Sequence, residues 1–153
     1  MGAALAPASA SAEERTCRGS LGGVTVDNLR VPQGATCTLT GTRVKGTIKV
    51  ERSATLSARG VRVVGNVQGE NARRVDVIRS SRIGGSVQVK QGGAARVLDS
   101  HVNGDIQMFK NTGGVRIANN RVNGNLQCKE NRPAPTGGGN VVQGNKEDQC
   151  ARL

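Results

Sequence analysis

A five-residue motif recurs along this chain at a nearly constant spacing. It joins an aliphatic residue, any residue, a glycine, a small polar residue and a second aliphatic residue, as in Val44-Lys45-Gly46-Thr47-Ile48. Its glycines are almost evenly spaced and lie at these positions: Gly46, Gly65, Gly85, Gly104, Gly124 and, in a weaker copy, Gly144. A fixed period of about 20 residues with alternating apolar positions predicts short strands that stack coil upon coil.

The composition agrees with a stack of coils. The 153 residues include 22 glycines and one phenylalanine, but no tyrosine and no tryptophan. A compact globule normally fills its core with aromatic side chains, whereas a solenoid buries only thin columns of small aliphatic ones. The sequence therefore predicts one β-helix domain over residues 13–153, of which 129–153 form an irregular capping segment.

Each coil divides into inward and outward positions. Alternate strand residues face opposite sides, so Val44, Ile48 and Val50 are expected inside, with Gly46 at an inward spot too tight for a side chain. A second inward pair recurs upstream: Cys37/Leu39, Leu56/Ala58, Val75/Val77, Ala95/Val97 and Val115/Ile117. Small polar residues form a corner between the motif and this upstream pair. Each coil is therefore expected to contain two clear strands and a third short one. The predicted fold is all-β: a right-handed parallel β-helix of about six to seven coils.

Four cysteines occur in two pairs near the ends of the predicted stack. Cys17 and Cys37 are separated by one period of the repeat, and Cys128 and Cys150 by slightly more than one period. Residues one period apart lie about 4.8 Å from each other on adjacent strands, within reach of a disulfide. Of the three connectivities, Cys17–Cys37 with Cys128–Cys150 keeps both bonds local. A zinc site is less favoured because no Cys-x-x-Cys pair is present.

The first twelve residues have the composition of an export signal. Ala8-Ser9-Ala10 and Ala10-Ser11-Ala12 fit the small-x-small pattern of a secretory cleavage site. Residues 1–12 are thus interpreted as the remnant of a signal peptide, the alternative being a flexible leader. Paired cysteines favour export, so the expected location is secreted, extracellular or associated with the cell envelope. A cytosolic protein with free thiols is the alternative, and no stretch approaches the roughly 20 apolar residues of a membrane span.

One outward column is basic. It contains the residues three positions before the first five motif glycines, here called the arginine row: Arg43, Arg62, Arg82, His101 and Arg121. The whole chain carries a net charge of +11. Like charges on adjacent strands repel one another unless anions or carboxylates offset them, so the row is a candidate strip for binding an anionic polymer. Solvated arginines that follow from repeat duplication, and a basic composition that follows from coding bias, are the alternative.

Two further outward columns predict structural ladders. Lys49, Gln68, Gln88, Gln107 and Gln127 form the first, in which glutamine amides are expected to bond along the stack. Thr47, Asn66, Ser86, Asp105, Asn125 and Asn145 form the second, interpreted as turn residues. His101, the only histidine, lies close to Asp99 in the chain. A surface residue of the row is favoured over an acid–base pair.

The ends of the stack are expected to be covered, because open strand edges invite association. Residues 13–24 are assigned to one end. At the other end, residues 132–139 contain two prolines and three glycines and are expected to form a loop, because proline cannot donate to a ladder.

The repeat over about residues 24–146 resembles the right-handed parallel β-helix proteins. Among these it is most similar to small secreted β-helix proteins of actinobacterial type, a resemblance that implies no assigned activity. The Val-x-Gly-x-Ile pattern is also similar to bactofilins, cytoskeletal β-helices that polymerise end to end. The cysteine pairs, the leader and the positive charge depart from the bactofilin pattern.

These features favour a secreted, non-enzymatic structural or surface protein, acting as a scaffold or assembly unit. β-Helix enzymes that act on polysaccharides carry long loops and clustered acids, while this chain has coils of nearly constant length and scattered acids. An enzyme of that kind is the least favoured hypothesis. A binding module for an anionic polymer, such as a cell-wall polyanion, an acidic glycan or a nucleic acid, is the main alternative. No cofactor is expected, and the chain is predicted to be a monomer or a laterally associated homo-oligomer.

Overall fold

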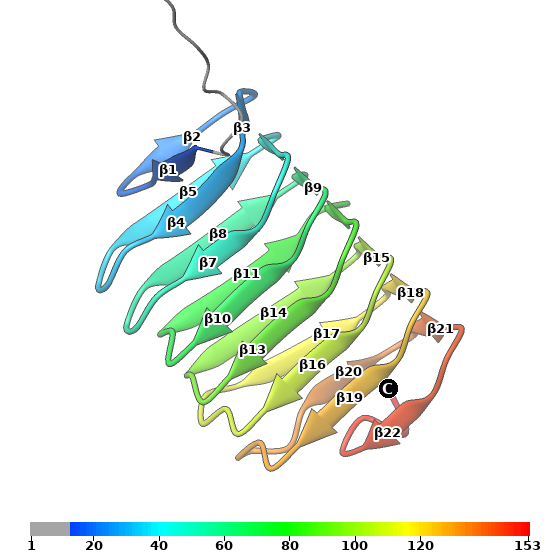
Figure 1. Cartoon of the computed structure of the whole chain (residues 1–153). Helices are drawn as coiled ribbons and strands as arrows, with labels where there is room; N and C mark the ends of the chain where they lie inside the picture. The colour runs from blue at the N-terminus through cyan, green and yellow to red at the C-terminus, as the bar shows by residue number, and fades with distance from the viewer. Residues whose placement is uncertain (1–12) are drawn as a thin grey trace, which may run out of the picture.

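The protein is a parallel β-solenoid of about seven turns, as the sequence predicts (Figure 1). The computed structural model describes residues 13–153; the predicted leader, residues 1–12, lies outside the described residues. Residues 13–153 form strands and turns only, and none of them belongs to a helix capable of spanning a bilayer.

Each full coil adds one strand to each of three parallel sheets, here called A, B and C. Sheet A has eight strands: β1 (Glu14–Thr16), β4 (Asn28–Val31), β7 (Ile48–Val50), β10 (Val67–Glu70), β13 (Val87–Lys90), β16 (Ile106–Phe109), β19 (Leu126–Lys129) and β22 (Lys146–Asp148). Sheet B has seven: β2 (Ser20–Leu21), β5 (Thr36–Thr40), β8 (Thr55–Arg59), β11 (Arg74–Ile78), β14 (Ala94–Leu98), β17 (Val115–Ala118) and β20 (Thr136–Gly138). Sheet C has seven short ones: β3 (Thr25–Val26), β6 (Arg43–Val44), β9 (Arg62–Val63), β12 (Arg82–Ile83), β15 (His101–Val102), β18 (Arg121–Val122) and β21 (Val141–Val142).

Aliphatic columns fill the space between the sheets. In sheet C the inward residues stand in register from coil to coil and are at most 3% exposed: Val44, Val63, Ile83, Val102 and Val122. The second inward pair is confirmed on sheet B, where Leu56, Val75, Ala95 and Val115 form one buried column. Every coil therefore buries its apolar residues against the coils on either side.

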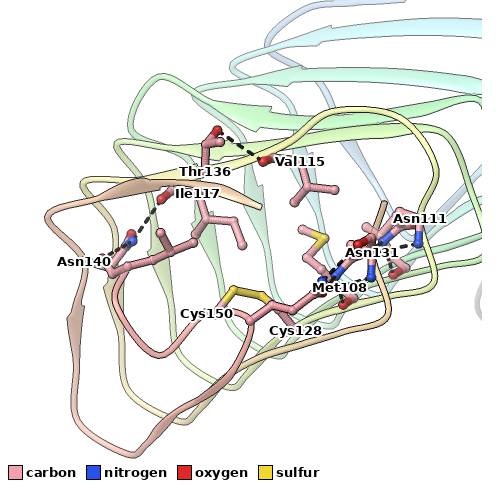
Figure 2. Close-up of a disulfide and its surroundings, with 12 residues drawn as sticks. Met108, Asn111, Val115, Ile117, Cys128, Asn131, Thr136, Asn140 and Cys150 are labelled. Atoms are coloured by element: carbon pink, nitrogen blue, oxygen red, sulfur yellow. Dashed lines mark hydrogen bonds between the residues drawn. A yellow bond between two sulfur atoms is a disulfide. The ribbon is translucent and has the colours of Figure 1, made fainter. Parts of the chain in front are cut away.

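Buried amide side chains line the corners of the solenoid. Asn120 is 2% exposed, and its Oδ1 accepts a hydrogen bond from the backbone N–H of Ser100 at 3.0 Å. Its Nδ2 donates to the carbonyl of Val97 and to Oδ1 of Asn140. Figure 2 shows the equivalent bond from Asn111 to Asn131 at another corner. These ladders satisfy backbone groups that the turns leave without strand partners.

The motif glycines are required by contact between coils. A Cβ on Gly104 would lie 2.8 Å from the carbonyl oxygen of Gly85, the equivalent residue of the preceding coil. Such a separation is well inside van der Waals contact, and backbone atoms cannot move away cheaply. The tight spot predicted at these glycines is confirmed, but it lies between coils; the prediction that it faces the interior is wrong.

The small polar residue after a motif glycine accepts a hydrogen bond from the backbone of the next coil. Ser86 Oγ accepts from the backbone N–H of Asp105 at 2.9 Å, and Asp105 Oδ1 accepts from that of Asn125 at 2.7 Å. The same bond joins the other members: Thr47 to Asn66, Asn66 to Ser86 and Asn125 to Asn145. The predicted turn ladder is therefore confirmed.

Both predicted disulfides are present. The Cα atoms are 5.6 Å apart in Cys17–Cys37 and 5.4 Å apart in Cys128–Cys150. Figure 2 shows the second bond at the end of the stack, with Met108 and Ile117 nearby. Cys17–Cys37 joins the first described coil to the next one, and Cys128–Cys150 joins β19 to the segment after β22, so both ends of the described solenoid are covalently fastened.

The loop predicted over residues 132–139 is confirmed for 132–135 and wrong for 136–138, which form a strand. Pro133 and Pro135 precede the strand, and Thr136–Gly138 forms β20, which pairs with β17. Gly137 and Gly138 have φ values of 136° and 147°, a conformation that L side chains rarely adopt. Their backbone groups still enter the ladder, since the carbonyl of Gly138 accepts from the N–H of Asn119 at 2.9 Å.

The two ends are covered in different ways. At the start, residues 13–24 form a first coil, in which β1 pairs with β4 and β2 pairs with β5. Leu21 packs on the core there. At the other end the segment 149–153 folds back, and the carbonyl of Leu153 accepts hydrogen bonds from the backbone and side chain of Asn140.

Candidate anion-binding face

The structure brings all five members of the arginine row together on sheet C. Their strands are β6, β9, β12, β15 and β18, and the ladder pairs Arg43 with Arg62, Arg62 with Arg82, Arg82 with His101, and His101 with Arg121. Adjacent parallel strands are about 4.8 Å apart. The row is therefore a straight line of basic side chains along the stack.

The two-residue strands of sheet C explain why these side chains face outward. In each strand the second residue, such as Val44 or Val102, is buried in the core. The residue before it must then point to solvent. The four arginines of the row are exposed, and His101 is half-buried between Arg82 and Arg121.

The four arginines of the row have no acidic partner among residues 13–153. The ion pairs of this region lie on other faces: Arg30 binds Glu14 and Glu51, and Asp76 binds Arg74 and Arg96. Asp105, in the turn column, accepts a hydrogen bond from the backbone N–H of Asn125 and forms no ion pair with the row. The repulsion along the row is thus not offset by carboxylates of the described residues.

An open hollow of about 520 Å³ runs beside the row. Its wall includes Arg43, Arg62, Arg82 and His101. The opposite side comes from the outward column just before the motif glycine: Lys45, Val64, Gly84 and Asn103. This column was not predicted to contribute to a site, although its fixed place in the motif puts it on the same face of sheet C. Gly84 lacks a side chain and Val64 is 66% exposed, so the hollow has a partly apolar surface.

His101 and Asp99 do not form an acid–base pair. Both line a second hollow on the other side of the row, but no hydrogen bond joins them. Asp99 occupies a corner position with a φ of 50°, outside the short strand that carries His101. The Nε2 atom of His101 is buried and finds no hydrogen-bond partner within residues 13–153.

The glutamine column is a structural ladder, as predicted. Nε2 of Gln68 donates to Oε1 of Gln88 at 3.1 Å, and the bonds from Gln88 to Gln107 and from Gln107 to Gln127 are both 2.8 Å. Each of these three donors makes one hydrogen bond to the next glutamine along sheet A. The column is therefore occupied internally and is not a candidate ligand site.

The chain was compared with protein-family models, with curated proteins and with solved structures, and none of them matches. The part of the chain that the structure describes holds no group of three or more His, Cys, Asp or Glu residues suited to a metal ion. The features of this chain that bear on its function are therefore its fold, its disulfides and its charged faces.

Proposed function

We propose that this protein is a structural or surface protein that acts outside the cell. The observation that carries the proposal is the pair of disulfides, one at each end of the solenoid. Disulfides persist in oxidising compartments and are rare where thiols are kept reduced. Between them the coils have nearly constant length and no long loops, which suits a rigid unit that presents fixed columns of side chains.

The location and the cysteine chemistry are testable together. We expect the full chain, produced with its own N-terminal segment in a secreting bacterial host, to be found in the medium or the envelope fraction. Mass spectrometry after maleimide labelling in denaturant should then detect no label before reduction and four labels, one per cysteine, after it. Accumulation inside the cell with four labelled thiols before reduction would contradict the proposal.

A second function is favoured by the arginine row: binding of an anionic polymer along the stack. Its support is the straight register of four arginines that lack acidic partners among residues 13–153, next to an open hollow. A polyanion lying along the row would replace the missing carboxylates and relieve the repulsion between neighbouring strands. Each phosphate or acidic group neutralised would also release a counterion.

Binding through the row is expected to weaken steeply with salt. We expect the oxidised protein to bind duplex DNA, heparin or teichoic acid, with log K falling linearly with log salt concentration. Changing Arg43, Arg62, Arg82 and Arg121 to Gln should reduce that slope by about 3 to 4, since each cation contributes about 0.9 on duplex DNA.

A control variant with the same net charge distinguishes binding by the row from general attraction between a basic protein and a polyanion. It changes four exposed cations of sheet A and its turns to Gln, namely Arg52, Lys110, Lys129 and Arg132. This control should keep most of the affinity and slope. An equal loss in both variants, or binding that ignores salt, would refute binding by the row.

A further inference from the structure

A second basic cluster lies on sheet B, built around one buried acid. Asp76, in β11, is 3% exposed. Its Oδ2 accepts a hydrogen bond from Nε of Arg74 at 2.8 Å and another from Nη2 of Arg96 at 2.9 Å. Arg96 is the ladder neighbour of Asp76 in β14, and Arg116 is the ladder neighbour of Arg96 in β17. Figure 1 shows these three strands side by side.

The aspartate holds two guanidinium groups in place. Both bonds are charge-assisted, and such bonds are shorter and stronger than neutral ones. The hydrogen bond that Arg96 donates to Asp76 raises the pKa of Arg96. Exposed arginines normally sample many rotamers, but Arg74 and Arg96 share one fixed anchor. Their remaining N–H groups are thereby oriented before any ligand arrives.

The cluster carries more positive charge than its acid can offset. Three arginines stand against Asp76 alone, and Arg116 has no ion-pair partner within residues 13–153. The terminal nitrogens of Arg74 and Nη1 of Arg96 donate to no group of the described region, and Arg116 donates none of its side-chain N–H groups there. Several donors and two positive charges therefore remain available at one place.

A hollow of about 260 Å³ lies between these three arginines. It exists because the outward column that begins with Arg74 continues with the small residues Ala94 and Gly114. A Cβ added to Gly114 would meet nothing within 4 Å, so this part of the surface is open. The last coil closes one side with Pro133, Ala134 and Thr136.

We propose that this hollow, here called the Asp76 site, binds a single oxyanion group: a carboxylate, sulfate or phosphate, carried by a free ion or by an acidic glycan. Guanidinium groups match the oxygens of such anions with two parallel hydrogen bonds. Arg116, unpaired at the rim, supplies the charge that the buried aspartate does not cancel. The site lies on sheet B, apart from the arginine row on sheet C, and depends on neither function proposed above.

The test is isothermal titration calorimetry of the oxidised protein at fixed ionic strength with sulfate, phosphate, acetate, glucuronate and, as neutral control, glucose. We expect saturable binding of one anion per chain for at least one of these anions, and none for glucose. Arg116→Gln should weaken it about tenfold or more, the usual effect of losing a charged hydrogen bond. Arg52→Gln removes an exposed arginine in the turn after β7, outside both the hollow and the arginine row, and should leave the affinity unchanged.

A second variant tests the contribution of the open space independently of the positive charge. Gly114→Val fills the open space without removing a cation, and its thermal unfolding shows whether the fold is kept. A folded variant that no longer binds the anion supports the site. Glucuronate binding without acetate binding assigns the site to an acidic sugar, and binding of sulfate or phosphate alone assigns it to a free ion. The absence of saturable binding, an equal loss in Arg52→Gln, or full binding by folded Gly114→Val would overturn the proposal.

Discussion

Replacing Asn120 by alanine is expected to lower the free energy of unfolding by about 3–4 kcal/mol, although the change removes only one small polar side chain. Asn120 is 2% exposed, and its side chain bonds the buried N–H of Ser100, the carbonyl of Val97 and Oδ1 of Asn140. In the variant Oδ1 of Asn140 keeps the backbone N–H of residue 120 as a donor, so the cost comes from the other two groups. Each buried group left without a partner costs about 1–3 kcal/mol, and a core corner offers water little access. The variant also creates a small cavity.

Asn123→Ala is the matched control, because it makes the same chemical change in the same coil. Asn123 Nδ2 donates only to Oδ1 of Asn103 on the outer surface, so the expected loss is below about 0.5 kcal/mol. Urea denaturation followed by circular dichroism gives both values from the midpoint and slope. Similar losses in the two variants would mean that the corner ladder contributes no more than a surface contact.

The architecture could be predicted because every coil repeats the same local information. The alternation at Val44 and Ile48 recurs in each copy, so the inward columns and the cysteine pairing follow from one period. Some coils, however, are longer than others by a single amino acid, and the sequence does not say where the extra residue goes. If the extra residue lay within a strand of sheet C, the register would shift and the members of the arginine row would no longer be aligned.

The extra residue is absorbed at the corners. From β8 to β11 the ladder pairs Thr55 with Arg74, but from β9 to β12 it pairs Arg62 with Arg82, which is one position further along the chain. The added residue lies in the turn between β11 and β12, where Arg79 and Ser80 have φ values of 58° and 62°. These two consecutive left-handed residues accommodate the extra residue within the turn. The strands of sheet C therefore keep their register, and the arginine row stays straight.

The Asp76 site could not be predicted, because it depends on two neighbouring columns at once. Asp76 and Arg96 belong to one column, while Arg74 and the small residues Ala94 and Gly114 belong to the other. Taken singly, Asp76 is one of several scattered acids. Arg74 lies two residues before Asp76 in the same strand, but only the register places Arg96 beside its carboxylate. The Gly137–Gly138 strand was missed because its positive φ values have no distinct sequence signal beyond glycine itself.

Removing the second disulfide is expected to cost about 3 kcal/mol and to loosen only one end of the molecule. Cys128 and Cys150 are both fully buried, and their bond closes a short segment at the end of the chain. Without that link the unfolded chain gains conformational freedom, while β22 keeps a ladder on one side only, with β19. In a solenoid each coil contacts only its neighbours, so the destabilisation should stay local.

Hydrogen exchange on the Cys128→Ser/Cys150→Ser variant measures that locality. We expect faster exchange at the amides of β20, β21 and β22, with unchanged protection in the central strands β8 and β11. The Cys17→Ser/Cys37→Ser variant is the mirror control and should instead expose β1 and β2, which also have a ladder on one side only. If either variant raised exchange evenly through all coils, the stack would unfold as one cooperative unit. The disulfides would then stabilise the whole solenoid instead of fastening its ends.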